Sequence, residues 1–249
     1  MIVAGNWKMN LNINEAIELS NGLLKHNDIF FEEKIIIFPS FLIIPEIYNL
    51  YKNSKISIGA QDCSMYDNGA FTGQVSAEMI KDAGCKYVII GHSERRSLCH
   101  ETSSIVSQKA VKAVSAGLKV IICIGENSKD REKGDYLFVL ENQLKQSLSD
   151  ISSVSNLLSK NIIIAYEPVW AIGTGNTASK KDIEEVHKFI KEIISSNYQF
   201  NYHLPILYGG SVNSKNSSEI FKINNVDGVL VGGASLNSDE FLKIINNSM

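Results

Sequence analysis

The sequence has no excess of positive charge: 24 lysines and arginines stand against 27 aspartates and glutamates, which gives a formal net charge of −3. Proteins that bind nucleic acids usually present a basic face, so we expect no nucleic-acid partner. Long apolar runs are also absent, since none exceeds five residues. A helix that spans a membrane needs ~18, so we expect no membrane partner.

Cysteine is scarce, and the four cysteines form no C-x-x-C pair. They are Cys63, Cys85, Cys99 and Cys123. Such isolated thiols are typical of a reducing compartment. The first eight residues lack a basic segment and turn polar by residue 5, which argues against a signal peptide. Both features favour a cytoplasmic protein.

The overall composition is that of a folded chain. Hydrophobic residues make up 44% of the 249 residues and charged residues 20%, close to the average of globular proteins. Single α/β barrels routinely reach ~250 residues. Because no linker or change in composition divides the sequence, we expect one domain over residues 1–249.

Short apolar runs rich in β-branched residues recur along the whole chain. They begin near Ile2, Ile35, Ile56, Tyr87, Val120, Ile162, Ile206 and Val229. Runs such as 120–124 and 162–166 are apolar at every position, which is typical of parallel strands that are buried on both faces. The pattern therefore predicts eight strands.

Helical patterns lie between these runs. The clearest extends from Ile183 to Ile194, with apolar residues three and four apart, and Ser179 with Asp182 forms a candidate capping box in front of it. Other candidate helices cover residues 15–25, 104–116, 136–148 and 239–246.

Alternating strands and helices predict right-handed crossovers and a parallel sheet. Eight units in this length fit a closed (β/α)8 barrel. The alternative is an open doubly wound sheet, whose edge strands should be more polar than its centre. The first and last runs are as apolar as the middle ones, so the sequence favours the closed α/β barrel.

Glycine pairs follow the seventh and eighth runs, at Gly209-Gly210 before Ser211 and at Gly232-Gly233. Barrel enzymes carry their chemistry at the C-terminal ends of the strands and often bind phosphate with these two loops. Glycine lets backbone N–H groups approach the ligand closely. The glycines could instead make only tight turns, but their position on both strands favours a phosphate site.

Residues 168–178 contain two further patterns. Residues 173–178 match G-x-G-x-x-A but do not directly follow a strand, so we expect no dinucleotide site, and no P-loop motif occurs. Residues 168–175 combine the apolar patch Val169 to Ile172 with Pro168 and two glycines. This composition favours a lid that closes over a substrate, and the alternative is a loop that stays packed down.

Three polar residues follow strands at the same mouth of the barrel. Glu167 ends the sixth run, and we interpret it as a solvated base that loses water when the lid closes. His92 precedes the expected start of a short helix, whose positive N-terminus would keep the imidazole neutral. Lys8 follows the first run. Each could be an ordinary structural or surface residue, but together they predict a proton-transfer site without a metal-ligand cluster.

Longer strings surround these residues. They are NWKMN at 6–10, GAFTG at 69–73, VIIGHSERR at 88–96, CIGE at 123–126, YEPVWAIGTG at 166–175 and YGGSV at 208–212. In this order they resemble the triosephosphate isomerase family, and the resemblance extends from residue 6 to residue 233. It implies a TIM barrel that acts as a homodimer in the cytoplasm.

The resemblance also implies an isomerase of glycolysis and gluconeogenesis, connected to the pentose phosphate pathway. Its reaction interconverts dihydroxyacetone phosphate and D-glyceraldehyde 3-phosphate through a cis-enediolate, with no cofactor and no metal. Glu167 would move the proton between the two carbons. His92 would hydrogen-bond to the enediolate oxygens and shuttle protons between them, and Lys8 would supply positive charge. The implied substrate-binding residues are Asn6, Lys8, Gly173, Ser211, Gly232 and Gly233.

Two positions depart from the family pattern: Asp62 stands where Asn is expected and Gln74 where Glu is expected. Both flank the loop that, in this family, projects into a partner subunit. The two departures therefore bear on the details of the dimer interface and not on the reaction. Two rival interpretations have weaker support. A sugar-phosphate epimerase should show His and Asp metal ligands, which we do not find, and a non-catalytic scaffold would not need Glu167 or His92.

Overall fold

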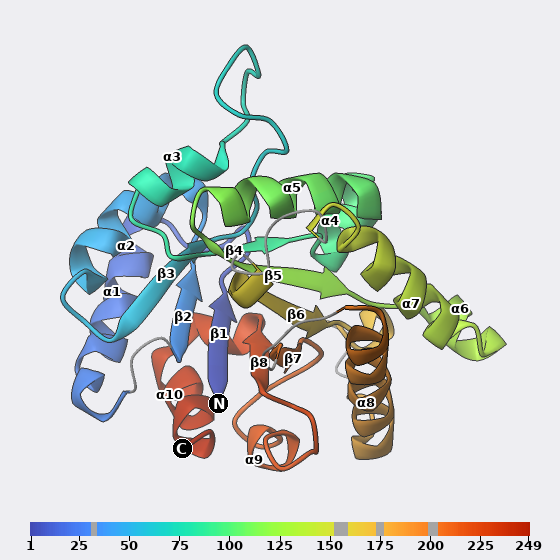
Figure 1. Cartoon of the computed structure of the whole chain (residues 1–249). Helices are drawn as coiled ribbons and strands as arrows, with labels where there is room; N and C mark the ends of the chain where they lie inside the picture. Colours follow the sequence, from blue (N-terminus) through green and yellow to red (C-terminus); the bar gives the residue numbers. More distant parts are fainter. Residues whose placement is uncertain (31–33, 152–158, 173–176, 199–203) are drawn as a thin grey trace.

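Eight parallel strands pair in chain order and close into a barrel, with β1 hydrogen-bonded to β8 (Figure 1). The computed structural model describes residues 1–30, 34–151, 159–172, 177–198 and 204–249. The strands are β1 (Ile2–Asn6), β2 (Ile35–Phe38), β3 (Ile56–Ala60), β4 (Tyr87–Ile90), β5 (Lys119–Ile124), β6 (Ile162–Tyr166), β7 (Ile206–Tyr208) and β8 (Gly228–Val231). The predicted closed barrel is confirmed, and the open sheet is excluded.

Helices surround the strands on the outside of the barrel (Figure 1). They are α1 (Ile13–Leu24), α2 (Ile44–Tyr51), α3 (Ala77–Asp82), α4 (Ser93–Leu98), α5 (Ser103–Ser115), α6 (Ser128–Lys133), α7 (Tyr136–Ser147), α8 (Lys180–Asn197), α9 (Ser217–Ile220) and α10 (Ser238–Asn247). The predicted helices correspond to α1, α5, α7, α8 and α10, and the capping box of Ser179 and Asp182 is present.

Strand side chains alternate between two apolar layers. Residues such as Ile36, Ile89 and Ile121 form one buried cluster, whereas their neighbours Ile37, Ile90 and Ile122 belong to a second, larger cluster that also contains helix residues. Since successive side chains of a strand point to opposite faces, every strand except β3 has apolar side chains on both faces; on β3, Ser57 and Gly59 occupy the second face. Within the described residues, no helix is long and apolar enough to cross a membrane.

A loop between β3 and α3, residues 61–76, stands away from the rest of the molecule (Figure 1). Near its tip, the rings of Tyr66 and Phe71 stack with centroids 4.1 Å apart, and both remain about 40% exposed. At its base, Asp62 pairs with Lys109 and with Arg95, at 2.8 and 2.9 Å. Ion pairs with α4 and α5 therefore hold the base of the loop.

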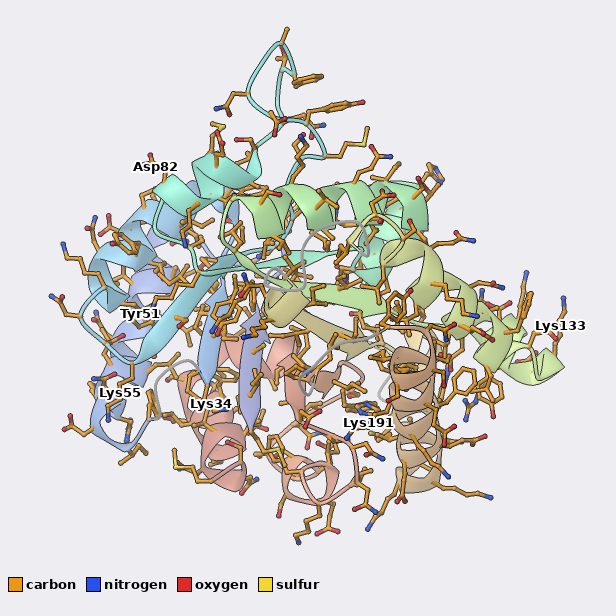
Figure 2. All side chains as sticks on the ribbon, in the orientation of Figure 1. Lys34, Tyr51, Lys55, Asp82, Lys133 and Lys191 are labelled. Atoms are coloured by element: carbon orange, nitrogen blue, oxygen red, sulfur yellow. The ribbon has the colours of Figure 1, made fainter. Side chains whose placement is uncertain are left out.

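His187 is a fully buried histidine on α8 that packs edge-on against Tyr166 of β6. Its Nδ1 lies 3.0 Å from the backbone oxygen of Asn225, and the Asn225 side chain accepts a hydrogen bond from Lys191, which Figure 2 labels. Nε2 has no partner among the described residues. Burial lowers the pKa of His187 to about 4, so the ring is neutral in the folded protein at neutral pH.

This burial makes the stability of the fold depend on pH. An unfolded chain protonates the ring near pH ~6.5, but the folded protein does so only near pH 4. Because the unfolded state binds the extra proton between these values, the free energy of unfolding should fall by about 3 kcal/mol as the pH drops through this window. Denaturant titrations of wild type and His187→Gln measure this difference in slope.

The control for this prediction is the same substitution at His26, which is exposed. His26→Gln should keep the acid-induced loss of stability seen in wild type. If His187→Gln keeps it too, the buried imidazole is not its source.

Candidate active site

A cavity of about 320 Å³ lies at the C-terminal ends of the strands. It is lined by Asn6, Lys8, His92, Glu167, Ile172, Gly209, Gly210, Ser211, Val212, Asn213, Leu230, Gly232, Gly233 and Ala234. All the candidate site residues from the sequence border it, except Gly173, which lies outside the described residues. Residues from five strand ends thus meet around one space.

Glu167 directly follows β6 and is only 1% exposed. Its Oε2 accepts a hydrogen bond from the backbone N–H of Ser93 at 2.9 Å, and its Oε1 lies 2.9 Å from Nε2 of His92. The expectation of a solvated carboxylate is therefore wrong for this structure, in which Glu167 is buried. The reason is that His92 and the N–H of Ser93, in the first turn of α4, contact the two carboxylate oxygens in place of water.

Burial and the neighbouring polar groups have opposite effects on the pKa of Glu167. Burial alone would raise it, but His92, the Ser93 N–H and the charge of Lys8 together hold the pKa of Glu167 below its ordinary value. Burial disfavours the charged form, whereas a hydrogen-bond donor or a positive charge favours it. The carboxylate is therefore ionised, and it is available as a base without the loss of a proton to solvent.

His92 is the N-cap of α4, as its predicted place before a short helix requires. Its Nδ1 accepts the backbone N–H of Glu94 at 3.2 Å, so the ring hydrogen belongs on Nε2, which faces Glu167. Burial lowers the pKa of His92, but the carboxylate of Glu167 outweighs it and leaves the pKa above its ordinary value while the two touch.

Lys8 enters the cavity from the segment after β1. Its backbone has a φ of +53°, a left-handed conformation that costs energy for any residue with a side chain. The backbone N–H of Lys8 donates to the Asn6 side chain at 3.0 Å, and Gln61 donates to the Lys8 carbonyl at 2.8 Å. Its ammonium group pairs with Glu94. Asn6 and Gln61 thus hold a strained turn that aims Lys8 at the cavity.

The opposite end of the cavity has backbone donors. Ser211 follows β7, and Gly232 with Gly233 follows β8 at the start of a short 3-10 helix, Gly233–Leu236. Within the described part of the chain, the N–H groups of these three residues donate to no other residue. Free N–H groups at the start of a helical turn attract an anion, so this end fits a phosphate group.

The beginning of the expected lid is fixed by Glu126, which follows β5 and is fully buried. The Trp170 indole donates to its Oε1 at 2.9 Å and the Tyr166 hydroxyl at 3.0 Å, while the Val169 N–H donates to its backbone oxygen. Arg131 lies over the Trp170 ring at 5.7 Å. Burial raises the pKa of Glu126.

Gly125 supports the base from behind. Its backbone N–H and C=O both bond to the Gln143 side chain, each at 2.9 Å. A Cβ at this position would lie 1.8 Å from the backbone oxygen of Glu167. Only glycine lets the two chain segments approach so closely.

Sequence reasoning did not assign roles to Ser93, Glu94 and Glu126, although each follows a predicted strand. Their position at strand ends was the available signal, as it was for His92. Among the described residues, no three His, Cys, Asp or Glu side chains gather where they could hold a metal ion.

A closed barrel that brings a buried carboxylate, an imidazole, a lysine and free backbone donors to one cavity has the make-up of a (β/α)8-barrel enzyme. More specifically, the chain belongs to the triosephosphate isomerase family, whose family model matches residues 1–248. It is therefore an isomerase.

Individual relatives agree over the full length. The triosephosphate isomerase of Lawsonia intracellularis is 46% identical over 248 residues, which cover 99% of this chain and 97% of the relative. That of Flavobacterium psychrophilum is 43% identical, with 98% of both chains covered. The crystal structure of triosephosphate isomerase from Bartonella henselae superposes with a TM-score of 0.87 at 38% identity, covering 99% of this chain and 98% of that one.

Proposed function

We propose that the cavity at the barrel mouth interconverts dihydroxyacetone phosphate and D-glyceraldehyde 3-phosphate by moving one proton between neighbouring carbons. The observation that carries this proposal is the hydrogen-bonded pair of Glu167 and His92, 2.9 Å apart, in the same cavity as Lys8 and the free N–H groups of Ser211 and Gly233. The pair supplies a base and a donor, and the rest supplies charge for an anion.

The Glu167 carboxylate removes a proton from C1 of dihydroxyacetone phosphate, and the C–H electrons shift toward the carbonyl to form a cis-enediolate. The same carboxyl group then returns the proton to C2, which gives the aldehyde. The substrate must first separate Glu167 from His92. Loss of that hydrogen bond removes one of the contacts that lower the pKa of Glu167 and so makes the carboxylate a stronger base.

His92 donates Nε2–H to the substrate oxygens and relays protons between them. Once the substrate lies between the two side chains, the raising effect of Glu167 on the pKa of His92 weakens. Burial, the nearby charge of Lys8 and the N–H of Glu94 on Nδ1 then all favour the neutral ring. A neutral donor suits the weakly acidic enediol, because donor and oxygen exchange the proton readily.

Lys8 stabilises the negative charge of the enediolate and of the phosphate, and Asn6 positions it. The substrate phosphate occupies the opposite end, against the N–H groups of Ser211, Gly232 and Gly233, with Gly173 as a further donor from the lid. Donors that are fixed before the reaction stabilise developing charge without reorganisation. The chemistry requires no cofactor, because only a proton moves within the substrate.

A coupled assay on dihydroxyacetone phosphate, run before and after exhaustive chelation, tests this function. Turnover should be unchanged by the chelator. Complete loss of turnover that a divalent ion restores would instead support a metal-dependent sugar-phosphate epimerase.

We further propose that residues 1–249 form one catalytic domain that works in the cytoplasm and has no nucleic-acid or membrane partner. The acidic balance of the sequence and the single barrel that extends from β1 to α10 support this proposal.

We also propose a homodimer, in which the projecting loop 61–76 packs on a second copy of the chain. The half-exposed rings of Tyr66 and Phe71 support this, since stacked rings on an extended loop gain little from their own chain. Figure 2 shows that side chains of this loop stand clear of the rest of the molecule. Exposed apolar groups of this kind are typical of contact surfaces.

Wild type should therefore sediment at twice its chain mass of 27.6 kDa at micromolar protein, because obligate interfaces usually bury over ~2,000 Å². Phe71→Asp should shift the protein toward the monomer, since a charge at the loop tip would be buried without a partner. The matched control is Phe138→Asp, at an exposed ring on α7. A monomeric wild type with full activity would refute the dimer.

A further inference from the structure

Arg96 on α4 bonds to the backbone of two neighbouring strands below the active site. Its Nε donates to the carbonyl of Gly91 at 2.8 Å, and its Nη2 donates to the carbonyl of Cys123 at 3.0 Å. The hydroxyl groups of Ser103 and Ser147 complete its hydrogen bonds at 2.9 and 3.1 Å. Every nitrogen of the guanidinium group therefore has an acceptor.

The two carbonyls mark the place where strand pairing ends. The β4–β5 register runs to the pair Ile90 and Ile122, so Gly91, which follows β4, and Cys123 of β5 are the next residues along the chain. Arg96 bridges the strands directly beyond their last pair. Gly91 makes room for it, because a Cβ there would lie 3.0 Å from Nη2, and its φ of +64° is open to glycine.

On the β4 side, the bridge fixes the peptide group that precedes the catalytic histidine. Gly91 is bonded to His92, and the next N–H, that of Ser93, holds Oε2 of Glu167. A shift of the Gly91 carbonyl would therefore move both the imidazole and the backbone donor of the base.

On the β5 side, the bridge reaches the strand that supports Glu167. Cys123 pairs with Ala165 of β6, and the carbonyl of the next residue, Ile124, accepts the N–H of Glu167 at 2.8 Å. One side chain thus connects the backbone of both members of the catalytic pair.

The charge of Arg96 adds a second effect. Within the described residues, no carboxylate lies within ion-pair distance of Arg96, although Glu167 and Glu101 are close enough to act on it electrostatically. An arginine stays protonated in proteins. Its charge therefore favours the ionised form of Glu167 from the side away from the substrate.

From this geometry we infer that Arg96 is a positioning residue for the isomerisation: it sets the distance between Glu167 and His92 through the carbonyls of Gly91 and Cys123. The inference rests on the proposed function. It assigns to Arg96 no contact with the substrate, whose phosphate lies against Ser211, Gly232 and Gly233.

Two substitutions separate geometry from charge. Arg96→Lys keeps the charge, but a single ammonium lacks the planar fork that reaches two carbonyls, so kcat should fall ~10²-fold, the cost of about 1 Å of misplacement. KM should stay within about twofold, because the phosphate end is untouched. Arg96→Ala should lose kcat at least as strongly and should also move the acid limb of its kcat/KM profile to higher pH.

The design includes a control and a rescue. Ser103→Ala removes one acceptor of Arg96 but leaves both carbonyl bonds, so its kcat should match wild type. Arg96 also lines a second cavity, of about 210 Å³, beside Glu167. Guanidinium chloride at non-denaturing concentration should partly restore kcat of Arg96→Ala, whereas sodium chloride at equal ionic strength should not.

The outcomes are distinct. An inactive wild type would refute the proposed function itself. If wild type is active and folded Arg96→Lys keeps its kcat, the positioning role is wrong. The positioning role is also wrong if both variants lose activity only in proportion to their loss of folded protein, measured by circular dichroism. In that case the acid limb of the kcat/KM profile stays in place and guanidinium restores no activity.

Discussion

Glu167→Gln should lower kcat by about 10²–10⁴-fold, the usual contribution of a general base. Gln keeps the size of the side chain and can still accept the Ser93 N–H, but it cannot take a proton from carbon. Glu167→Asp keeps the base and withdraws it by one methylene, about 1 Å, which costs ~10²-fold where geometry is tight. Asp should therefore be less damaging than Gln.

In both variants KM should change little, because the donors at the phosphate end remain in place. Steady-state kinetics with melting curves make the measurement, and Glu219→Gln, at an exposed glutamate paired with Lys222, is the matched control. Near-normal turnover of Glu167→Gln would show that this carboxylate is not the base, whatever the fold.

Deletion of Val169 to Ile172 should change the product as well as the rate. An enediolate beside a phosphate ester can break the C–O bond and expel inorganic phosphate, which leaves the enol of methylglyoxal. This elimination needs the C–O bond to align with the π system. A lid that holds the phosphate in the enediolate plane prevents alignment and excludes water. The shortened protein should therefore release a larger fraction of its turnovers as phosphate and methylglyoxal.

The measurement compares isomerised product with free phosphate in the same reaction. Trp170→Phe serves as the control, since it keeps an aromatic ring in the lid and removes the indole N–H that donates to Glu126. Its product ratio should stay near that of wild type. A deletion that slows the reaction and leaves the ratio unchanged would mean that the segment only positions the substrate.

The barrel could be predicted from the sequence because burial on both faces leaves a local signal. The runs that begin at Ile2, Ile35 and Ile162 begin strands at the same residues, and the runs at Val120 and Val229 begin one residue late. The expected helices were those of ten or more residues. Short helices such as α3 and α9 have too few turns to show a period, so the pattern did not reveal them.

The candidate site was predictable as a set of strand ends, because a parallel barrel brings those ends to one mouth. Contacts between segments that are far apart in the sequence were not predictable. The N–H that holds Oε2 of Glu167 belongs to Ser93, 74 residues away, and the two carbonyls that Arg96 joins are 32 positions apart in the sequence. The packing of the folded chain brings these groups together, and a local sequence pattern carries no information about it.

Gly125 carries a consequence for how this sequence can change over evolutionary time. Any replacement would add an atom where the main chain of Glu167 already lies, and the base would have to retreat from its substrate. By the estimate of ~10²-fold for about 1 Å, even alanine would be eliminated by selection for turnover. A position without a side chain, which neither contacts the substrate nor titrates, is thus as closed to variation as the base itself.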